Sequence, residues 1–412
     1  MADITVRLRR LSHSIERLMS IAGTPGVAIG VMTKDYPISY DNHCFRDVEN
    51  KLAVTEDTIF PICSLTKAIT AAGVSLLVEE DRVTWDSLIK DILPDFRSVN
   101  PVLHNDTTIT DILSHCTGMG WGDNVILGTA GNILLGSEDI MKYINNRPLV
   151  RPFRAQFGYN NLHYELADSI IEKVSGQPYF YFMQSRLLDP LGMERTSFQT
   201  PSKSVHGVAV CYNTLDDASA VPIDFLKIGD DGYGAASGGA RSSVKDLLKL
   251  YSSFIKAPIL GPVETVRLPG RFGQIGLNPA LLPQGMPIIG RGISSLVLFH
   301  QGSLPGSLTF VGLLPETETV IVVLTNSLAL NDAADWIGQL IIVEIVNAPS
   351  ELRIDFIGLA EAAVTENLKW YPRVLDELEK GRKAGTSPRP LTEYVGTYWD
   401  DLHILKVEVK LV

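Results

Sequence analysis

The stretch FPICSLTK at residues 60–67 leads into a segment with helical periodicity that extends from Ser64 to about Glu80. Apolar side chains cover a broad face of this segment, which predicts a largely buried helix. Ser64 and Lys67 are three positions apart, so they lie on one helix face about one turn apart. An unpaired charge is costly to bury, and a lysine at this place therefore needs a reason.

That reason can be nucleophilic catalysis. A serine hydroxyl is a weak nucleophile until a base takes its proton, and a lysine is such a base when burial lowers its pKa. Backbone N–H groups at the start of the helix would stabilise negative charge on the reacting group. The alternative is an N-capping serine followed by a solvated lysine, and S-x-x-K alone does not separate the two.

The regions on either side predict a sheet that is built from both chain ends. Strand and helix patterns occur near the N-terminus and again from about residue 293, whereas residues 85–300 contain mostly short helical patterns and loops rich in Gly and Pro. This order favours an α/β sandwich in which helices flank an antiparallel sheet and a mostly helical subdomain is inserted. Strand patterns occupy residues 27–32, 295–300, 309–314 and 320–325, and helical patterns occupy 11–22, 166–174, 244–254 and 335–346.

Two parts are expected along the chain. Residues 1–350 form the main domain, with the helical subdomain inserted at about 85–290. Residues 351–412 are expected to be a linker and a short strand-rich extension, because 380–390 is charged and contains Gly and Pro, and 394–398 and 402–412 have strand patterns.

Composition limits the function classes. The 412 residues are 45% hydrophobic, and 36 Lys+Arg against 47 Asp+Glu give a net charge of −11, which disfavours nucleic acid and anionic membranes as partners. The four cysteines are scattered without a CxxC pair, and the eight histidines include no H-E-x-x-H pair, so neither a metal site nor a disulfide framework is expected. A charged start and the lack of an 18-residue apolar run predict a cytoplasmic protein without a membrane span.

A second motif, Tyr159-Asn160-Asn161, precedes a helical pattern and therefore lies on a loop or at a helix entry. Tyr159 can act as a general base or proton relay if a nearby ammonium favours its phenolate. Asn161 can donate to a substrate carbonyl and accept from Lys67. The alternative is a turn with a half-buried tyrosine.

A third motif, His300-Gln301-Gly302-Ser303, ends a predicted strand. Gly302 would let a substrate approach the backbone closely, and the Ser303 N–H could pair with the Ser64 N–H as an oxyanion hole. The alternative for His300 is a packed or exposed histidine. Trp121 either lines the substrate pocket or is simply a packed aromatic side chain.

A competing motif lies at Ala235-Ala236-Ser237-Gly238-Gly239, an A-x-S-x-G variant of the nucleophile elbow. An elbow needs a strand before it and a helix after it. The preceding run, residues 227–232, has the composition of a loop, which argues against this motif as the source of the nucleophile.

Together, S-x-x-K, Y-x-N and the strand motif resemble the serine β-lactamase and penicillin-binding-protein superfamily, where they occur in this order. The class C-like branch is most similar, with its esterase and transesterase relatives and the fungal lovastatin-type acyltransferases. The resemblance covers about residues 10–345, and the end of the chain, residues 393–398, is similar to the G-x-Y opening of a small β-barrel appended to some members. Further similar stretches are Leu113–Gly118, Leu188–Thr196 and Gly238–Ser243.

The resemblance implies a role for each motif residue. Ser64 would be the acylated nucleophile, Lys67 its proton partner and Tyr159 the second base. Asn161 would orient substrate and Lys67, and the Ser64 and Ser303 N–H groups would form the oxyanion hole. No cofactor is implied.

One departure from the family bears on the substrate. Members that bind β-lactams carry lysine where this chain has His300, and a hydroxyl residue where it has Gln301. A weaker anion site favours a neutral or bulky ester, hydrolysed by water or transferred from an acyl donor to an alcohol acceptor. The alternatives are a β-lactamase or D-peptidase, and a binding protein or natural-product rearrangement in the same cleft. An oligomer is possible.

Overall fold

The computed structural model describes residues 4–123, 133–202, 204–224, 227–229, 233–256, 271–274, 296–350, 353–387 and 389–412. Within them, a seven-stranded sheet has the order β3-β2-β1-β11-β10-β9-β8, and every neighbouring pair is antiparallel. β1 pairs with β11, so the predicted sheet from both chain ends is confirmed. The strands are β1 (Gly26–Thr33), β2 (Tyr36–Asp47), β3 (Leu52–Ala53), β8 (Arg271–Gln274), β9 (Leu296–Leu304), β10 (Ser307–Leu314) and β11 (Thr319–Thr325).

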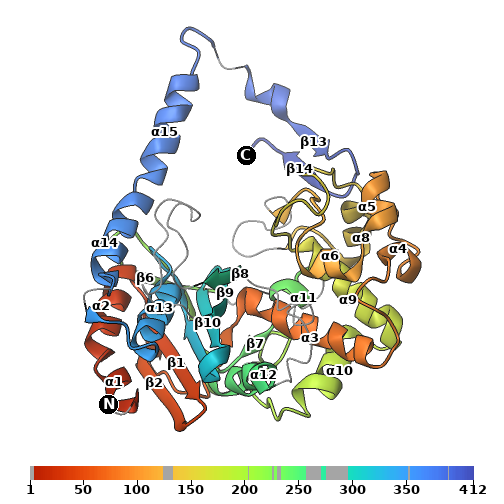
Figure 1. The fold of residues 1–412 in the computed structure, drawn as a ribbon. Helices are drawn as coiled ribbons and strands as arrows, with labels where there is room; N and C mark the ends of the chain where they lie inside the picture. Colours follow the sequence, from red (N-terminus) through yellow and green to blue (C-terminus); the bar gives the residue numbers. More distant parts are fainter. Residues whose placement is uncertain are drawn as a thin grey trace.

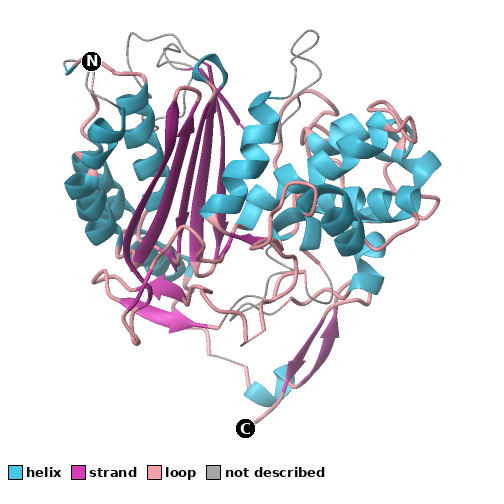
Figure 2. Ribbon diagram, turned by 90° about the horizontal axis from the view of Figure 1, so that it is seen from below, coloured by secondary structure: helices cyan, strands magenta, loops and turns pink. Residues whose placement is uncertain are grey.

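The central strands β10 and β11 are buried along their whole length and mostly apolar, because both faces of the sheet are covered. In β11, Ile321 and Val323 face one layer, and Val320, Val322 and Leu324 face the other. Figure 2 shows the sheet nearly edge-on between two groups of helices. Side chains alternate along a strand, so a strand covered on both faces must be apolar at every position.

One layer consists of α1 (Ile4–Arg9), α2 (Ser12–Ala22) and α13 (Ala333–Ile345), whose apolar faces cover β1, β10 and β11. The other layer contains α3 (Thr66–Glu79), α9 (Leu162–Ser175) and α12 (Val244–Lys256). α12 lies so close to β1 that a Cβ on Gly30 would be 2.8 Å from the Leu248 side chain.

The helical middle of the chain lies on the α3 side of the sheet (Figure 1). The further helices of this region are α4 (Ile89–Ile92), α5 (Pro101–Asp106), α6 (Ile109–Leu113), α8 (Ser137–Asn145), α10 (Tyr179–Met183), η3 (Gln184–Leu188) and α11 (Ala235–Gly238). β4 (Phe60–Pro61) pairs with β7 (Arg241–Ser242). A small separate sheet of β5 (Cys211–Thr214), β6 (Ala220–Ile223) and β12 (Ser327–Leu328) lies at the end of α2, where the Thr214 hydroxyl donates to the Gly23 carbonyl at 2.9 Å.

Sequence periodicity located the long elements to within a few residues, although Ser295, the expected start of one strand, lies outside the described residues. β2 was missed. It pairs with β1 on one side and with only the two-residue β3 on the other, and most of its side chains are at least partly exposed. A strand near the sheet edge can be polar, so it lacks the apolar run that marks β1.

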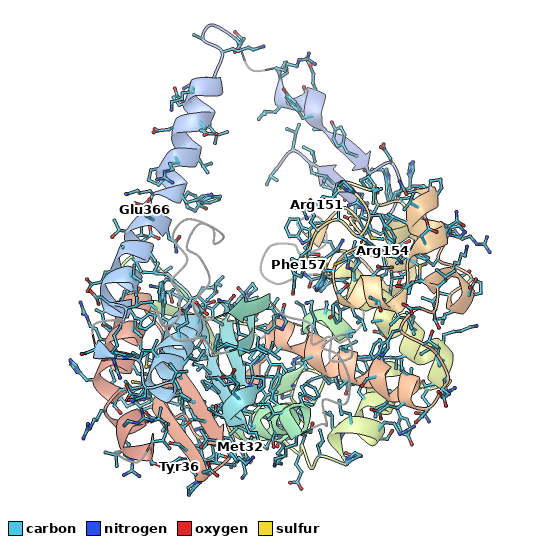
Figure 3. All side chains as sticks on the ribbon, in the orientation of Figure 1. Met32, Tyr36, Arg151, Arg154, Phe157 and Glu366 are labelled. Atoms are coloured by element: carbon cyan, nitrogen blue, oxygen red, sulfur yellow. The ribbon has the colours of Figure 1, made fainter. Side chains whose placement is uncertain are left out.

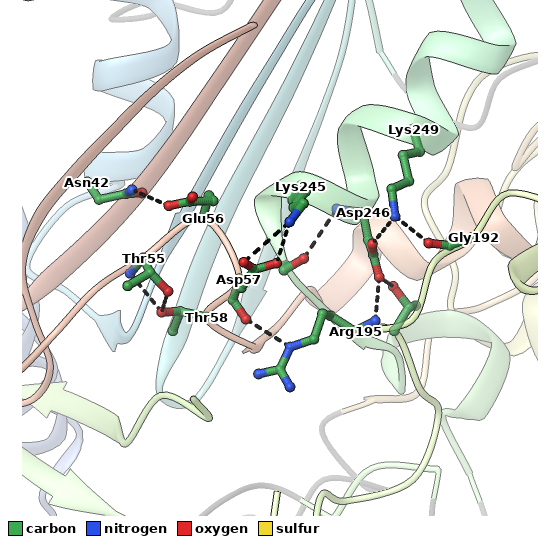
Figure 4. Close-up of polar contacts among 12 residues, drawn as sticks. Asn42, Thr55, Glu56, Asp57, Thr58, Gly192, Arg195, Lys245, Asp246 and Lys249 are labelled. Carbon is green, nitrogen blue, oxygen red and sulfur yellow. Dashed lines mark hydrogen bonds and ion pairs between the residues drawn. The ribbon is translucent and has the colours of Figure 1, made fainter. Parts of the chain in front are cut away.

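The stretch Leu188–Thr196 has a structural role at the base of α12 (Figure 4). The Asp246 carboxylate accepts from the Arg195 N–H at 2.6 Å and from the Thr196 hydroxyl at 3.0 Å. Lys249 bridges Asp246 and the Gly192 carbonyl. These contacts fasten the loop to α12, which in turn packs on the sheet.

The C-terminal extension differs from the expected linker and strands, because it begins with two helices. These are α14 (Phe356–Asn367), which packs against α2 with an Arg17–Glu361 ion pair at 2.6 Å, and the exposed α15 (Trp370–Gly381). After η8 (Leu391–Tyr394), strands β13 (Gly396–Trp399) and β14 (Lys406–Val409) pair with each other. The hairpin returns to the helical region (Figure 1), where the Leu402 carbonyl accepts from Lys142 at 2.7 Å.

The helices of the described ranges lack the length and apolar character that crossing a membrane requires.

Candidate active site

Ser64 lies at a strand-to-helix turn. β4 pairs with β7, and the Ile62 N–H donates to the Ala240 carbonyl at 3.0 Å, which fixes the approach to the turn. Cys63 then adopts a φ of 52°, a left-handed conformation that is strained for a side chain with a Cβ. The 3₁₀ turn η1 (Cys63–Leu65) precedes α3, so Ser64 stands just ahead of the α-helix that was expected to begin with it.

Lys67 is completely buried and reaches Ser64 as the spacing predicted. Its Nζ lies 3.2 Å from the Ser64 Oγ and 2.6 Å from the Ser237 carbonyl oxygen. Burial lowers the pKa of Lys67 to about 7, against the opposing effect of the Asp123 and Glu165 carboxylates. A lysine with this pKa can be neutral at physiological pH and can accept the serine proton.

Tyr159 approaches the nucleophile from the other motif. Its hydroxyl donates to the Ser64 Oγ at 2.7 Å, and the Lys67 Nζ lies 4.8 Å from its ring centroid. Tyr159 keeps 36% of its surface exposed, yet burial of the phenol raises its pKa. The expected phenolate is therefore not what the structure favours; Tyr159 is a neutral phenol that holds a proton beside Ser64.

Asn161 has a different partner from the expected one. Its amide donates to the Asp123 carboxylate, which also accepts from the Trp121 indole N–H at 2.8 Å and from the Tyr233 hydroxyl at 2.7 Å. Lys67 feels Asp123 only through charge, and no hydrogen bond joins Asn161 to Lys67 among the described contacts. Trp121 is 49% exposed and is not among the described pocket-lining residues, so it contacts the site through Asp123.

The third motif lies beside Ser64. A Cβ on Gly302 would be 2.8 Å from the Cys63 Cβ and 2.9 Å from the Ile62 carbonyl oxygen. The glycine expected to admit a substrate therefore admits the backbone of the nucleophile turn itself.

The edge of β9 at this point faces the nucleophile turn. β8 pairs only with 296–299 of β9, so the described strands leave its later residues unpaired on that side. The Leu308 backbone, opposite Ser303, exchanges hydrogen bonds with the Thr325 side chain on β11. Backbone groups alternate in direction along an antiparallel strand, so the Ser303 N–H points away from β10 and toward that edge. This is the direction that the predicted oxyanion hole requires.

A group of aromatic rings holds the loop that carries Tyr159. His115 accepts from the Asn160 N–H at 3.1 Å, and its ring centroid lies 4.6 Å from that of Tyr159 and 5.4 Å from that of Phe157. Phe157 lies at the edge of the helical region that faces the sheet (Figure 3). Burial lowers the pKa of His115 well below its ordinary value, so this ring is neutral. The similar stretch Leu113–Gly118 therefore positions Tyr159.

A cavity of about 410 Å³ opens at Ser64. The third-motif residues line it from β9, and Asp332, the N-cap of α13, lines it as well. The described lining residues are Ser64, His115, Phe157, Tyr159, Asn161, Phe299, His300, Gln301, Gly302, Ser303 and Asp332.

The competing serine, Ser237, has a different role. It is 4% exposed within α11, and its carbonyl accepts a hydrogen bond from the Lys67 Nζ. Residues 227–229 before it form no strand, and 230–232 lie outside the described residues. Over the described ranges, no cluster of three or more His, Cys, Asp and Glu side chains could hold a metal ion.

Four side chains at the site were not singled out by sequence reasoning: Asp123, His115, Glu165 and Asp332. Glu165 is 4% exposed, and one of its oxygens accepts from the Gly234 N–H at 3.1 Å. An acidic residue inside the apolar pattern that follows Tyr159 was the available clue. Asp123 and Asp332 become site residues only through tertiary contacts.

Comparisons with known proteins agree with this geometry. The family model described as Beta-lactamase matches residues 11–343. Among curated proteins, the chain is similar to the "Unguisins hydrolase ungD'" of Aspergillus campestris (strain IBT 28561), with 24% identity over 84% of this chain and 67% of that protein. It is also similar to "Protein flp" of Staphylococcus aureus (strain MW2), with 25% identity over 77% of this chain and 63% of that protein.

Two solved structures share the fold. The octameric penicillin-binding protein homologue from Pyrococcus abyssi has a TM-score of 0.69 and 22% identity, over 98% of this chain and 85% of that one. The class C beta-lactamase from Rhodobacter sphaeroides has a TM-score of 0.64 and 18% identity, over 82% and 99%. The predicted β-lactamase-like sandwich is confirmed.

Proposed function

The chain belongs to the Beta-lactamase family of serine hydrolases, and on that premise we propose that it is an esterase or transesterase that works through an acyl-Ser64 intermediate. One observation carries the proposal: the Ser64 Oγ lies within hydrogen-bond distance of both the Lys67 Nζ and the Tyr159 hydroxyl. A nucleophile, a base and a proton donor therefore meet at one point on the wall of a cavity.

In the acylation step, neutral Lys67 takes the Ser64 proton while the Oγ attacks the ester carbonyl. The Ser64 and Ser303 N–H groups would receive the developing oxyanion, since Ser64 precedes the first helical hydrogen bond and the Ser303 N–H faces the same edge. When the tetrahedral intermediate collapses, the alcohol leaves and takes a proton from the Tyr159 hydroxyl. Tyr159 recovers a proton from Lys67, which returns both groups to their starting states.

In the deacylation step, the same pair acts on the incoming nucleophile. Lys67, through Tyr159, accepts a proton from a water or an acceptor alcohol, which then attacks the acyl carbonyl. Water gives hydrolysis, and an alcohol gives acyl transfer. The Ser64 oxygen leaves and recovers its proton, so no cofactor takes part in the balance.

The pocket favours esters without a carboxylate over carboxylate-bearing β-lactams. Its described lining residues include no lysine or arginine, and His300 stands where β-lactam-binding members have lysine. The name of the Aspergillus campestris relative, an unguisins hydrolase, also supports a hydrolytic reaction. The proposal also includes an acyl donor and an alcohol acceptor for the transfer reaction, and residence in the cytoplasm. It further includes an oligomeric state, which the octameric homologue supports.

The proposal is tested by intact-protein mass after exposure to a fluorophosphonate and, separately, to a short-chain activated ester. We expect one adduct on the wild type and none on Ser64→Ala. Ser75→Ala, a serine on the same helix whose hydroxyl donates to the Ala72 carbonyl, is the matched control and should label like the wild type. An adduct on Ser64→Ala, or none on the wild type, would contradict the acyl-Ser64 mechanism.

A further inference from the structure

The pocket wall next to the third motif consists of hydrogen-bond acceptors. Asp332 is the one carboxylate among the described lining residues. Its Oδ1 caps α13 by accepting from the Asp335 N–H at 3.0 Å, and neither Asp332 nor Asp335 has an ion-pair partner in the described part of the chain. A carboxylate that lines a substrate cavity without a cation can accept one from the substrate.

Gln301 adds to this wall. Its side-chain amide is hydrogen-bonded to the Asp335 carboxylate, which accepts a second hydrogen bond from Gln339 at 2.5 Å. This hydrogen bond lowers the pKa of the Asp335 carboxyl against the effect of burial, so it stabilises the ionised form and Gln301 donates its NH₂ group to Asp335. Its carbonyl oxygen is then the end of the amide that remains for the cavity. The position that carries a hydroxyl in β-lactam-binding members thus supplies an acceptor.

Burial and the neighbouring Asp335 charge raise the pKa of Asp332, and burial raises the pKa of Asp335, so a cation bound in the cavity would favour the ionised form of Asp332. The described lining residues contain no lysine or arginine, and His115 is neutral because burial lowers its pKa. The chain as a whole carries a net charge of −11, so its long-range field also attracts cations.

We propose that the natural substrate carries an ammonium group, which the Asp332 carboxylate and the Gln301 carbonyl bind while the scissile carbonyl lies at Ser64. This inference rests on the proposed function and names the substrate class for the same site: a cationic, amine-bearing ester or related acyl compound. Asp332 is a specificity-determining residue. The third motif therefore selects a charge opposite to the one that lysine selects in β-lactam-binding members.

The test compares three small aromatic probes that differ only in the polar end: phenethylammonium, 2-phenylethanol and phenylacetate. The ring suits the cavity, which Phe157 and Phe299 line. As competitive inhibitors of neutral-ester turnover, they should bind in the order ammonium, alcohol, carboxylate. The ammonium should bind about tenfold or more tightly than the alcohol, as for a hydrogen bond to a charged group. Raising the salt concentration should shrink this advantage.

Asp332→Asn should remove most of the ammonium-to-alcohol ratio. Asparagine is a good N-cap, so α13 keeps its first turn. The matched control is Asp355→Asn, which changes the N-cap of α14, and the ratio should stay as in the wild type. A purely structural role for Asp332 would weaken both probes equally and leave the ratio unchanged, which would overturn the proposal.

Two further outcomes are decisive. Equal or reversed affinities of ammonium and carboxylate for the wild type would overturn the inference without any variant. If no ester is turned over, calorimetric binding of the same probes still tests the inference, so failure of the catalytic proposal and failure of the cation site are distinguished.

Discussion

The two faces of the central sheet bury different kinds of side chain. Against α1, α2 and α13 the contacts at the middle of the sheet are apolar, with Leu18 and Ile337 at 1% exposure or less, and the buried Glu344 near the end of α13 is paired with Arg7 of α1. On the other side, where α3 meets α9, the buried side chains include ionisable groups: Lys67, His163 and Glu165 are each at 4% exposure or less.

This difference separates stability from chemistry. Burial of apolar surface stabilises the first layer, whereas buried ionisable groups cost free energy and shift in pKa. Burial lowers the pKa of His163 to about 3 and raises that of Glu165 to about 7. The layer of α3 and α9 thus relies on the stability of the α1, α2 and α13 layer. That stability lets it keep ionisable side chains buried, which is unfavourable for folding, in protonation states that are reactive.

The largest expected effect is on activity and lies on the α3 side. We expect Ser64→Ala to lower ester turnover by on the order of 10⁴-fold or more, and Lys67→Met by about 10³-fold. Neither should lower the free energy of unfolding, because an apolar side chain in place of a buried charge is often neutral or stabilising. Turnover rates and urea denaturation check both statements. A marked loss of stability in Lys67→Met would contradict the separation of catalysis and stability between the two layers.

The reverse pattern is expected on the other face. Leu18→Ala removes a buried α2 side chain far along the chain from the pocket residues and should lower the free energy of unfolding by about 2–5 kcal/mol. The folded fraction should turn over ester at the wild-type rate. A drop in kcat at full folding would mean that the two layers are coupled.

The pH dependence sharpens the account of the polar face. With a Lys67 pKa of about 7, ester turnover should fall about tenfold for each pH unit below 7, because protonated Lys67 cannot accept the serine proton. Glu165 raises the pKa of Lys67, so in Glu165→Gln the fall in turnover at acidic pH (the acidic limb of the profile) should move to lower pH. Profiles of kcat/KM for the two enzymes decide the matter, and coincident limbs would count against the role of Glu165.

Lys67 also links stability to pH. Its folded pKa is lowered, so between about pH 7 and 10.5 the unfolded chain binds more protons than the folded one, and stability should rise with pH through this window. Denaturation of the wild type beside Lys67→Met should show this rise in the wild type only. A rise of equal slope in both proteins would assign it to other groups.

The smallest effect is expected outside both layers. The exposed Lys245–Asp57 ion pair at the base of α12 has a separation of 3.2 Å (Figure 4). Lys245→Ala should change the free energy of unfolding by less than about 1 kcal/mol and leave turnover unchanged. Thermal denaturation of Lys245→Ala and Leu18→Ala side by side measures the two losses of stability. A loss in Lys245→Ala comparable to that in Leu18→Ala would contradict a minor role for this exposed ion pair.

The positions of the long elements and the contact between Ser64 and Lys67 follow from the amino-acid pattern alone. Periodicity located α3 and β11 because continuous burial requires apolar side chains at regular spacings, and helix geometry alone brings Lys67 to Ser64. It did not find β2 or the two helices of the extension, whose exposed faces impose weaker patterns.

The hydrogen-bond partners and protonation states of the site residues depend on how distant segments fold together. Asn161 lies against Asp123, Gly302 lies against the nucleophile turn, and Tyr159 is a neutral phenol, none of which follows from spacing along the chain. Asp332, 268 positions after Ser64, enters the same cavity only because α13 starts beside β9. Spacing along the chain fixes contacts within one turn of a helix. The pKa values and the pocket depend instead on which distant segments pack around a group and exclude water from it, and this is set by the tertiary fold.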